Sequence, residues 1–412
     1  MSLLTKIQTG IVSGNIPSLV QDVMSYALED GASDIHIEPE KKFTVIRYRI
    51  DGVLRSIAQI PMALQPALVS RIKIMGNLKI DEQRLPQDGK TNIVTENGRS
   101  MDLRINTLPT IHGEKIVIRL QDKSKVIPTF EQLGIRGSAL VNLNDGIAKP
   151  NGIVLVTGPT GSGKTTTLYS ALNKIRDESV NIMTLEDPVE YEMPGLAQSQ
   201  MHSAIGYSFA EGLRSALRQD PDIIMLGEIR DQETVEIAIR ASLTGHLVLS
   251  TIHTNSAIAT ISRVLDMGIK PYLFAAAITT IQAQRLVRKV CDNCIEQYQP
   301  SKKVVDDLLH HVRKLPPTEG LDVSSLHDIH LVRGKGCDSC SGSGYKGRMG
   351  IYEVLEVNKE LGKLIGSGAT EEEIETLAVK QGFVSILQDG LLKALAGITS
   401  IEEVFDVANV GE

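Results

Sequence analysis

The N-terminal third of the chain contains two apolar patterns, one with the period of a helix and one with the period of strands. A helical stripe is formed by Ile16, Leu19, Val20, Val23, Met24, Ala27 and Leu28. The segment "FTVIRYRI-DG-VLRSIAQI" predicts a hairpin with an Asp-Gly turn. A helix over about residues 62–77 and strands near "GKTNIV", "SMDLRINTL" and "EKIVIRL" follow. We therefore expect an α+β domain over residues 1–120.

The middle of the chain alternates short apolar runs with polar tips and amphipathic helices. Buried strands are predicted in "NGIVLVTG", "NIMTLEDPVEY", "PDIIMLGEIRD" and "HLVLSTIHTN". Between the last two, "DQETVEIAIRASLTG" has apolar residues at helical spacing. This alternation predicts an α/β fold with a parallel sheet, which gathers ligands at the carboxyl ends of its strands. Farther on, Thr370 with Glu373 and Ser400 with Glu403 predict capping boxes that open two helices.

The first of these strands runs into a glycine-rich loop, GPTGSGKT, and then a helix. That context is the one in which such a loop cradles phosphate groups with its backbone N–H groups. We expect Lys164 to reach the β- and γ-phosphates of a nucleotide and Thr165 to bind Mg²⁺. The predicted nucleotide-binding residues are Gly158, Pro159, Thr160, Gly161, Ser162, Gly163, Lys164, Thr165 and Thr166.

Acidic residues follow two other strands. Gly227 stands where many ATP-hydrolysing enzymes have a metal-holding aspartate, and Glu228 comes next. The strand "NIMTLE" ends in Glu186, followed by Asp187 and, farther on, Glu190. We assign Glu228 to activation of the attacking water and Glu186 to a place near Mg²⁺, although the sequence also permits the reverse. Glu190 is equally compatible with a solvated loop position.

Two histidines, His246 and His253, bracket the last of the four strands. Such residues are candidates for sensing the γ-phosphate, although a lone histidine is more often structural.

Four cysteines form two C-x-x-C pairs, Cys291 with Cys294 and Cys337 with Cys340. Four thiolates suit a closed tetrahedral zinc site. A redox dithiol or two disulfides are the alternatives, and a reducing cytoplasm disfavours the disulfides.

Composition narrows the function classes. The chain has 412 residues, 42% of them hydrophobic, which is enough for two to four domains with substantial cores. The net charge of −7 argues against a general nucleic-acid or anionic-membrane surface. No apolar run approaches the ~20 residues that span a bilayer, and the start does not read as a signal peptide. We expect a cytoplasmic protein.

Taken together, the motifs resemble those of the secretion ATPase superfamily that serves type II secretion and type IV pili. GPTGSGKT resembles its Walker A motif, "TLEDPVEY" its acidic box, "IIMLGEIRD" its variant Walker B motif and "LTGHLVLSTIHTN" its histidine box. "RLPQDGK" resembles a segment of its second N-terminal domain. In this family glycine before the glutamate is normal, so the resemblance implies an active site.

The resemblance implies a domain order. A PAS-like α+β domain (1–120) is followed by a linker or hinge (121–140), a RecA-like P-loop core (141–285), a tetracysteine zinc insert (286–350) and a helical C-terminal domain (351–412). It also implies ATP, Mg²⁺ and Zn²⁺ as ligands. The expected assembly is a hexamer, peripheral on the inner membrane, with platform and recruiting proteins as partners.

Four arginines gain a role from the same resemblance. Arg104 and Arg119 match N-domain arginines that approach the nucleotide phosphates when the domains close, and Arg214 and Arg218 match a second pair on the core. From spacing alone they read as ordinary surface or strand arginines. Guanidinium groups would neutralise the charge that develops in phosphoryl transfer.

The sequence permits more than one function and more than one domain content. The sequence does not separate pilus assembly from protein secretion. A nucleic-acid translocase with the same P-loop core, and a zinc scaffold without hydrolysis, are the alternative functions. Family members often carry a further N-terminal domain that docks on a membrane partner, and this chain begins close to the second domain. It is therefore either truncated or a short member.

Overall fold

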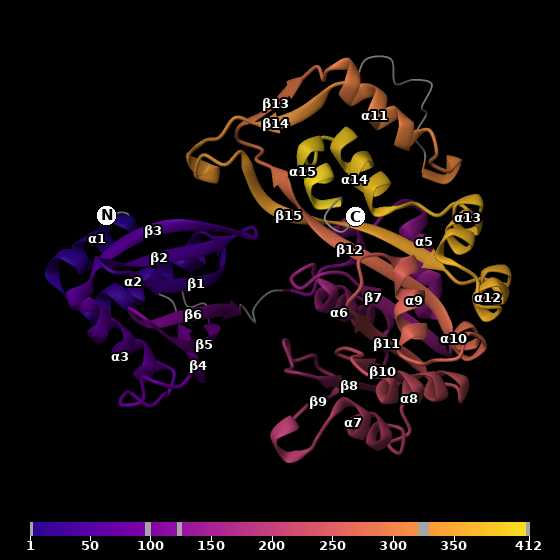
Figure 1. The fold of residues 1–412 in the computed structure, drawn as a ribbon, viewed down its shortest axis with the longest axis horizontal. Coiled ribbons are helices and arrows are strands. Elements are labelled where there is room, and N and C mark those ends of the chain that lie inside the picture. The colour runs from indigo at the N-terminus through magenta and orange to yellow at the C-terminus, as the bar shows by residue number, and fades with distance from the viewer. Residues whose placement is uncertain (1–2, 95–99, 122–125, 320–328, 409–412) are drawn as a thin grey trace. The chain divides into compact units, whose positions relative to one another are not determined.

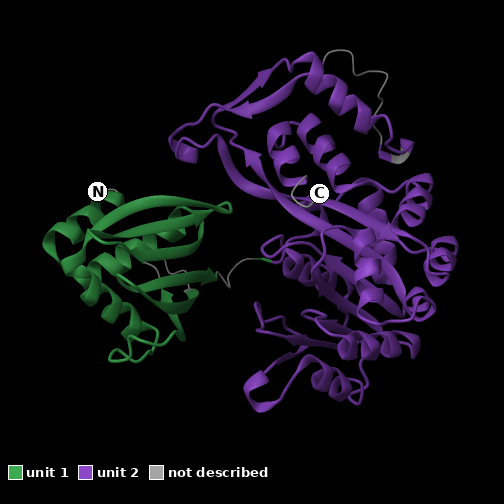
Figure 2. Cartoon of the chain, viewed as in Figure 1, with its two compact units in different colours: residues 1–126 green, residues 127–412 purple. Residues whose placement is uncertain are grey.

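The computed structural model describes residues 3–94, 100–121, 126–319 and 329–408 (Figure 1). The chain divides into two compact units, residues 1–126 and 127–412, drawn in different colours in Figure 2.

Unit 1 is an α+β domain with one six-stranded sheet in the order β3-β2-β1-β6-β5-β4. Its elements are α1 (Leu3–Ser13), α2 (Ile16–Glu29), β1 (Ala32–Pro39), β2 (Phe43–Ile50), β3 (Val53–Pro61), α3 (Gln65–Met75), β4 (Gln87–Val94), β5 (Ser100–Thr110) and β6 (Gly113–Gln121). All five strand pairings are antiparallel. The predicted helical stripe lies in α2, where Asn15 caps the first turn by accepting from the N–H of Ser18.

The predicted Asp-Gly hairpin is confirmed. Ile50 of β2 pairs with Val53 of β3, and the two residues between them have positive φ angles, 49° at Asp51 and 86° at Gly52. Positive φ at both central positions is the requirement of a type I′ turn, which Asp-Gly satisfies. The sheet buries one face against the helices, where the hydroxyl of Tyr48 donates to the carbonyl of Val23.

Unit 2 is built on a seven-stranded sheet in the order β15-β12-β7-β11-β10-β8-β9. Its first half comprises α4 (Phe130–Leu133), α5 (Gly137–Ala148), β7 (Gly152–Thr157), α6 (Lys164–Ile175), β8 (Ile182–Glu186), β9 (Ala197–Gln200), α7 (Phe209–Ala216), β10 (Ile223–Leu226), α8 (Gln232–Leu243) and β11 (Leu247–Ile252). Six strands run parallel and β15 is antiparallel to β12.

The second half of unit 2 completes the sheet and adds a helical layer. Its elements are α9 (Ala257–Asp266), α10 (Pro271–Ala277), β12 (Ile278–Val290), β13 (Ile295–Tyr298), α11 (Lys302–Val312), β14 (Leu331–Gly334), β15 (Tyr345–Glu356), α12 (Lys359–Gly366), α13 (Glu371–Lys380), α14 (Ile386–Leu395) and α15 (Ile401–Ala408). The sheet is sandwiched between two apolar clusters, with α5 and α6 on one face and α8, α9 and α10 on the other (Figure 1).

The long strands β12 and β15 leave the core together and carry the cysteine-bearing segment at their far end (Figure 1). Within that segment, Leu308 and Val312 of α11 and Leu331 of β14 share a buried cluster with α14 and α15. The segment and the C-terminal helices therefore form one apolar core. The capping box at Thr370 is confirmed. In the second predicted box, the hydroxyl of Ser400 accepts from the N–H of Glu403, but the carboxylate of Glu403 accepts from Arg288 and does not complete the box.

The segment expected to link the units belongs largely to unit 2. Thr129 forms a capping box with Gln132, and Phe130, only 2% exposed, lies in the apolar cluster under α5 and α6. The hydroxyl of Tyr352 in β15 donates to the carbonyl of Leu133 over 3.1 Å. From Thr129 onward the chain is therefore anchored to the sheet.

Candidate active site

The loop between β7 and α6 is closely backed by β12. A Cβ added to Gly158, whose φ is +141°, would lie 2.3 Å from the backbone oxygen of Gln284 in β12. Only glycine permits this approach and this backbone conformation. Pro159, Thr160, Gly161 and Thr165 are exposed, whereas Ser162 and Lys164 are buried. The loop thus presents its outer edge to solvent while its inner edge rests on the sheet.

Lys164 begins α6 and folds back over the loop. Its Nζ donates to the carbonyl oxygens of Gly158 at 2.8 Å and Pro159 at 3.1 Å. Burial lowers the pKa of Lys164, and the charge of Glu228 acts in the opposite direction. The ammonium group is therefore held beside the loop by weak, neutral acceptors, which an anion would outcompete.

The sheet brings the predicted polar tips to one edge. Thr157 at the end of β7 pairs with Ile252 of β11, and Leu226 of β10 pairs with Ser250 of β11 and Leu185 of β8. The residues that follow these strands, including Glu228 and His253, therefore lie at the same carboxyl edge as the loop. With the strand order β7-β11-β10-β8, the tip of β10 is one strand nearer to the loop than the tip of β8.

Glu228 is partly exposed and lies beside Arg230 and His253. Its side chain is 17% exposed, accepts a hydrogen bond from Arg230, and lies 3.2 Å from Nε2 of His253. Burial by itself would raise the pKa of Glu228, but the hydrogen bonds and charges of Arg230 and His253 hold the pKa below its ordinary value. Glu228 is thus ionised at neutral pH and fits the role of a base.

Glu186 has a different environment. It is 2% exposed, and its two oxygens accept from Tyr169 of α6 at 2.5 Å, Thr184 at 2.6 Å and Gln198 of β9 at 3.2 Å. Burial, followed by the hydrogen bond to Glu186, raises the pKa of Tyr169. Direct binding of Mg²⁺ would require Glu186 to release these donors.

The neighbours of these acids explain the glycine in the strand tip. The N–H of Gly227 donates to the carbonyl of Leu185, and its own carbonyl accepts from Thr251. A Cβ at this position would lie 3.3 Å from the oxygen of Leu185 and 3.5 Å from the ring of Phe209. A side chain would crowd this junction between β8 and β10, so the carboxylate is carried one residue later. Asp187 is exposed and Glu190 is partly buried.

His246 does not lie at this edge. It precedes β11, and its carbonyl accepts from the N–H of Gly152 at the start of β7. At about 3.3 Å per residue, the six residues of β11 separate His246 from His253 by roughly 20 Å. Nδ1 of His246 lies 2.8 Å from the carbonyl oxygen of Ala241. The phosphate-sensing role expected of His246 therefore does not fit its position, whereas His253 contacts Glu228.

The predicted arginines lie in two places. Arg214 of α7 pairs with Glu233 of α8, and Arg218 donates to the carbonyl of Arg214 at 2.8 Å. Both are thus tied to the exposed surface of α7. In unit 1, Arg104 of β5 is the register partner of Arg119 of β6, so both side chains emerge on one face of the sheet. Arg119 is 62% exposed and donates to Asp34.

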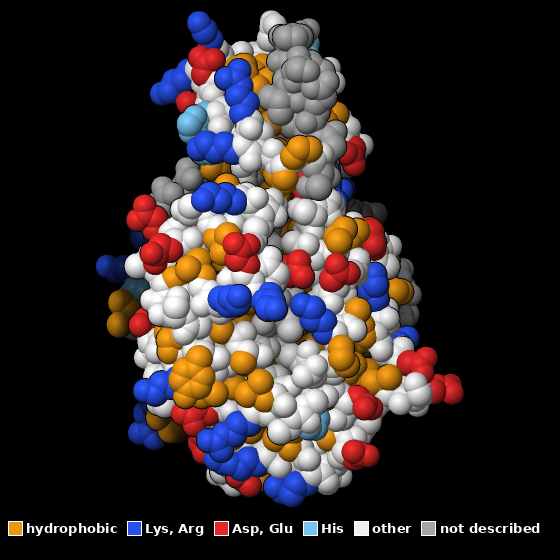
Figure 3. All heavy atoms as spheres, turned by 90° about the vertical axis from the view of Figure 1, so that its right-hand side faces the viewer, with side chains coloured by type: hydrophobic (Ala, Val, Ile, Leu, Met, Phe, Trp, Pro, Cys, Tyr) orange, Lys and Arg blue, Asp and Glu red, His pale blue; other side chains and the backbone are white. Residues whose placement is uncertain are grey.

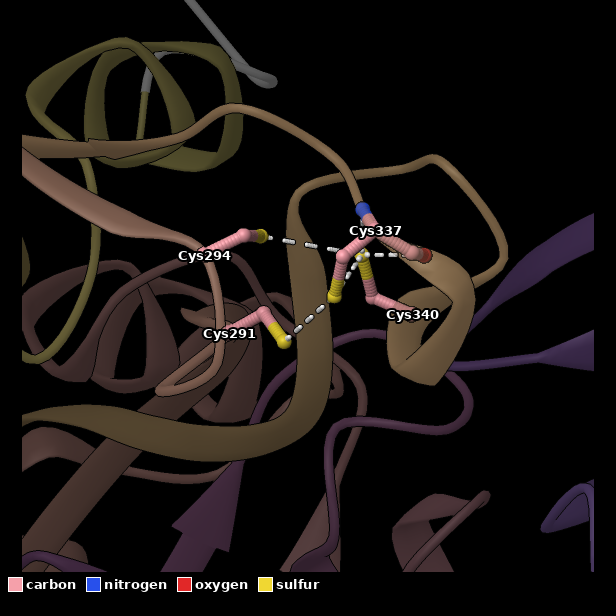
Figure 4. Close-up of side chains that lie close together, drawn as sticks. All are labelled: Cys291, Cys294, Cys337 and Cys340. Atoms are coloured by element: carbon pink, nitrogen blue, oxygen red, sulfur yellow. Dashed lines mark hydrogen bonds between the residues drawn. The ribbon is translucent and has the colours of Figure 1, made fainter.

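The four cysteines converge at the far end of β12 and β15, where β12 ends and β15 begins (Figure 4). The sulfur atoms are 3.9 Å apart in Cys291–Cys337, 3.8 Å in Cys294–Cys340 and 3.7 Å in Cys337–Cys340. Tetrahedral zinc with bonds of about 2.3 Å places its sulfurs about 3.8 Å apart. Disulfides need sulfurs about 2 Å apart, and all four cysteines are free. The geometry is therefore compatible with zinc.

Hydrogen bonding prepares one of these sulfurs for a metal. Burial would raise the pKa of Cys340, but the N–H groups of Cys337 and Gly344, each 3.2 Å from its sulfur, help to lower the pKa to about 6. A thiolate is the form that binds metal.

Sequence reasoning missed the residues that support the site from other elements. Tyr169 and Gln198 hold Glu186, and Arg230 holds Glu228. Gln282 and Gln284 of β12 are fully buried beneath the loop. The visible signal was a pair of amides two positions apart, Gln282 and Gln284, within the strand sequence "ITTIQAQRLV".

Comparison with known proteins places the chain. A sequence model of the Type II/IV secretion system protein family matches residues 12–406. The chain belongs to this family. Among curated relatives, it is 45% identical over 385 residues to the type IV pilus assembly ATPase PilB of Thermus thermophilus, covering 93% of this chain and 42% of that relative. It is 44% identical over 389 residues to the type II secretion system protein E of Pseudomonas aeruginosa, covering 94% and 74%.

Solved structures of similar fold extend over both units. The pilus retraction motor PilT with bound ADP is 26% identical, with a TM-score of 0.60 and coverage of 94% of this chain and 96% of that chain. The ATPase DotB of Legionella pneumophila is 22% identical, with a TM-score of 0.66 and coverage of 94% of each chain. The predicted fold class of this family member is thereby confirmed, with a P-loop core and a four-cysteine cluster.

Proposed function

We propose that the chain is the ATP-hydrolysing motor of a secretion or pilus-assembly machine. The observation that carries this proposal is the meeting of the loop 158–165 with Glu228 at the carboxyl edge of one sheet. Relatives named for type II secretion and for type IV pilus assembly support it equally, so the proposal covers both systems.

ATP binds with its phosphates in the loop 158–166. Lys164 exchanges two loop carbonyls for β- and γ-phosphate oxygens, because an anionic partner offsets the burial of its charge. The exposed Thr165 would hold Mg²⁺, which would supply positive charge to the phosphates. Glu186 fixes α6 through Tyr169 and would stand near the metal.

Glu228 takes the proton of the attacking water. Its ionised state is favoured by Arg230 and His253, and it follows β10, which lies two strands from the strand that carries the loop. In this mechanism, Arg104 and Arg119 of unit 1 approach the developing charge as the units close. Arg214 and Arg218 join only after Arg214 leaves Glu233. The hinge belongs to the predicted linker of residues 121–140, on the side that precedes the buried Phe130.

Cys291, Cys294, Cys337 and Cys340 would hold one Zn²⁺ per chain in a structural site, since four thiolates leave no open position for chemistry. Metal analysis of protein purified without chelator tests this, and we expect one zinc per chain. Protein that carries no zinc would contradict it.

The motor works as a hexamer at the cytoplasmic face of the inner membrane, bound to platform and recruiting proteins. None of the helices in the described residues is long and apolar enough to cross a bilayer. Figure 3 shows a face of unit 2 on which basic, acidic and apolar side chains are mixed, which suits protein partners. The net charge of −7 disfavours nucleic acid as the cargo.

ATP turnover of the whole chain tests the proposal, with Lys164→Ala as the control that removes the phosphate contact. We expect the rate of ATP turnover per chain to rise with protein concentration, because contacts between chains in the ring complete the active sites. Turnover no higher than that of Lys164→Ala would overturn it. A deletion strain, scored for surface pili and for missing secreted proteins, then separates pilus assembly from secretion.

A further inference from the structure

The strand behind the loop carries a buried polar network that the mechanism above does not use. Gln284 of β12 is 1% exposed and makes three hydrogen bonds. Its Nε2 donates to the carbonyl oxygen of Ser162 at 2.7 Å, and its Oε1 accepts from the hydroxyl of Thr167 and from Nε2 of Gln282, both at 2.8 Å. One amide therefore joins the loop, helix α6 and the strand.

A buried amide needs such partners, because burying it without them costs roughly 1–3 kcal/mol in proteins. An apolar side chain on this face of β12 would carry no such cost. The even-numbered neighbours Thr280 and Gln282 are also polar and fully buried. Oε1 of Gln282 has no hydrogen-bond partner among the residues the structure describes. Core packing alone thus does not account for this row of amides.

The contact with Ser162 acts on the phosphate-facing side of the loop. In a trans peptide, the carbonyl of one residue and the N–H of the next point in opposite directions. Gln284 draws the Ser162 carbonyl inward, so the N–H of Gly163 points away from β12, toward the open side of the loop. Gly163 is the N-cap residue of α6. Its φ angle of +90° accompanies this orientation of the Ser162–Gly163 peptide.

We propose that Gln284 is a positioning residue for nucleotide binding, which locks the Ser162–Gly163 peptide so that its N–H faces the phosphates. The inference rests on the proposed function and adds to it a residue outside the loop. Gln284 does not touch the nucleotide, so it acts through the loop and through Thr167. Its loss is expected to weaken binding of ADP and ATP while the chemistry at Glu228 continues.

The test measures affinity for ADP with Mg²⁺ by equilibrium binding to the full chain, together with KM and kcat for ATP. We expect Gln284→Leu to weaken ADP binding about tenfold and to raise KM similarly, with kcat within about threefold of wild type. The matched control is Gln388→Leu. Gln388 is a buried amide of α14 that bonds the carbonyl of His311 and the N–H of Ser385, far in the sequence from the loop. The Gln388→Leu variant is expected to lose thermal stability and to keep the ADP affinity of wild type.

A second variant, Gln284→Glu, keeps the shape. As a carboxylate it repels the Ser162 carbonyl, and as a carboxylic acid it donates to that carbonyl again. Its ADP affinity relative to wild type should therefore rise at least threefold between about pH 8.5 and pH 6, because burial raises the pKa of such a carboxyl. A merely structural loss would not be reversed by acid.

The outcomes separate the two claims. Wild-type protein that binds no ADP would overturn the proposed function and this inference together. Two results would overturn this inference alone. One is a Gln284→Leu variant that binds ADP as tightly as wild type, and the other is a Gln284→Glu variant that binds ADP as weakly at about pH 6 as at about pH 8.5.

Discussion

The tips of β8 and β10 carry the same residue type at the same edge of one sheet, yet they hold it in opposite ways. Glu186 at the tip of β8 is buried and bound by two hydroxyls and one amide, all neutral donors. Glu228 after β10 is partly exposed and bound by Arg230 and His253. One carboxylate is part of the interior, and the other lies where water and phosphate have access.

The position of a carboxylate at a strand tip therefore does not by itself define a catalytic role. A carboxylate that accepts from several buried donors is fixed, because releasing it leaves those donors without partners. A carboxylate paired with exposed cations can exchange its partners for water at little cost. We therefore assign the base to Glu228 and a supporting role to Glu186.

The largest effect is expected from Glu228→Gln. The amide keeps the shape of the side chain and cannot accept the proton of the attacking water. We expect kcat to fall on the order of 10²-fold or more, with ATP binding retained. Turnover and nucleotide binding of the full chain measure both. Near-normal turnover would move the base to Glu186 and reverse the comparison.

Glu186→Gln should have a smaller effect on rate and a clear effect on stability. The amide replaces one acceptor oxygen with a donor that faces the hydroxyl of Tyr169 or Thr184. We expect kcat to fall by less than about tenfold, and the free energy of unfolding to fall by roughly 1–3 kcal/mol. Denaturant unfolding measures the second quantity. A loss of rate equal to that of Glu228→Gln, with unchanged stability, would show that Glu186 acts in the chemistry.

Arg230→Ala tests the electrostatics of the Glu228 tip. Arg230 lowers the pKa of Glu228, so its removal raises that pKa and leaves less of the base ionised in acid. The acidic limb of the kcat profile should therefore move to higher pH, with turnover reduced on that limb and little changed near about pH 8. A pH profile identical to that of wild type would show that Glu228 does not limit the acidic limb.

The smallest effects come from the histidines, which provide an internal control. His253 contacts Glu228, whereas His246 lies at the other end of β11. We expect His253→Ala to lower kcat roughly two- to fivefold, because one hydrogen bond to the base is lost. His246→Ala should leave kcat unchanged. Equal losses of kcat in both variants would contradict the placement of the site at one edge.

Local patterns predicted much of the fold. The Asp51-Gly52 turn, the loop beginning at Gly158 and the apolar run before Glu228 each depend on neighbouring residues, so the sequence shows them directly. The fold class followed from their order along the chain.

The environment of the site could not be predicted in the same way. Glu186 is buried because Tyr169 and Gln198 arrive from α6 and β9, and Gln284 reaches Ser162 across 122 positions of sequence. Such contacts depend on tertiary packing, and the spacing of apolar residues along the sequence does not reveal them. The His246 expectation was avoidable, because a strand of six residues holds its two flanks far apart.

The pairing of β12 with β15 limits what a metal can do for the whole molecule. Val290 is the partner of Tyr345, so the sheet itself already closes the segment between them. A cross-link is worth most when it closes a long loop that would otherwise be free, since its effect arises from the entropy of the open chain. When the segment opens locally and the ladder stays formed, the four cysteines would close a loop whose ends are already joined. Chelation is therefore expected to loosen the segment together with α14 and α15, which share its apolar core, and to affect the strands that carry the nucleotide loop less.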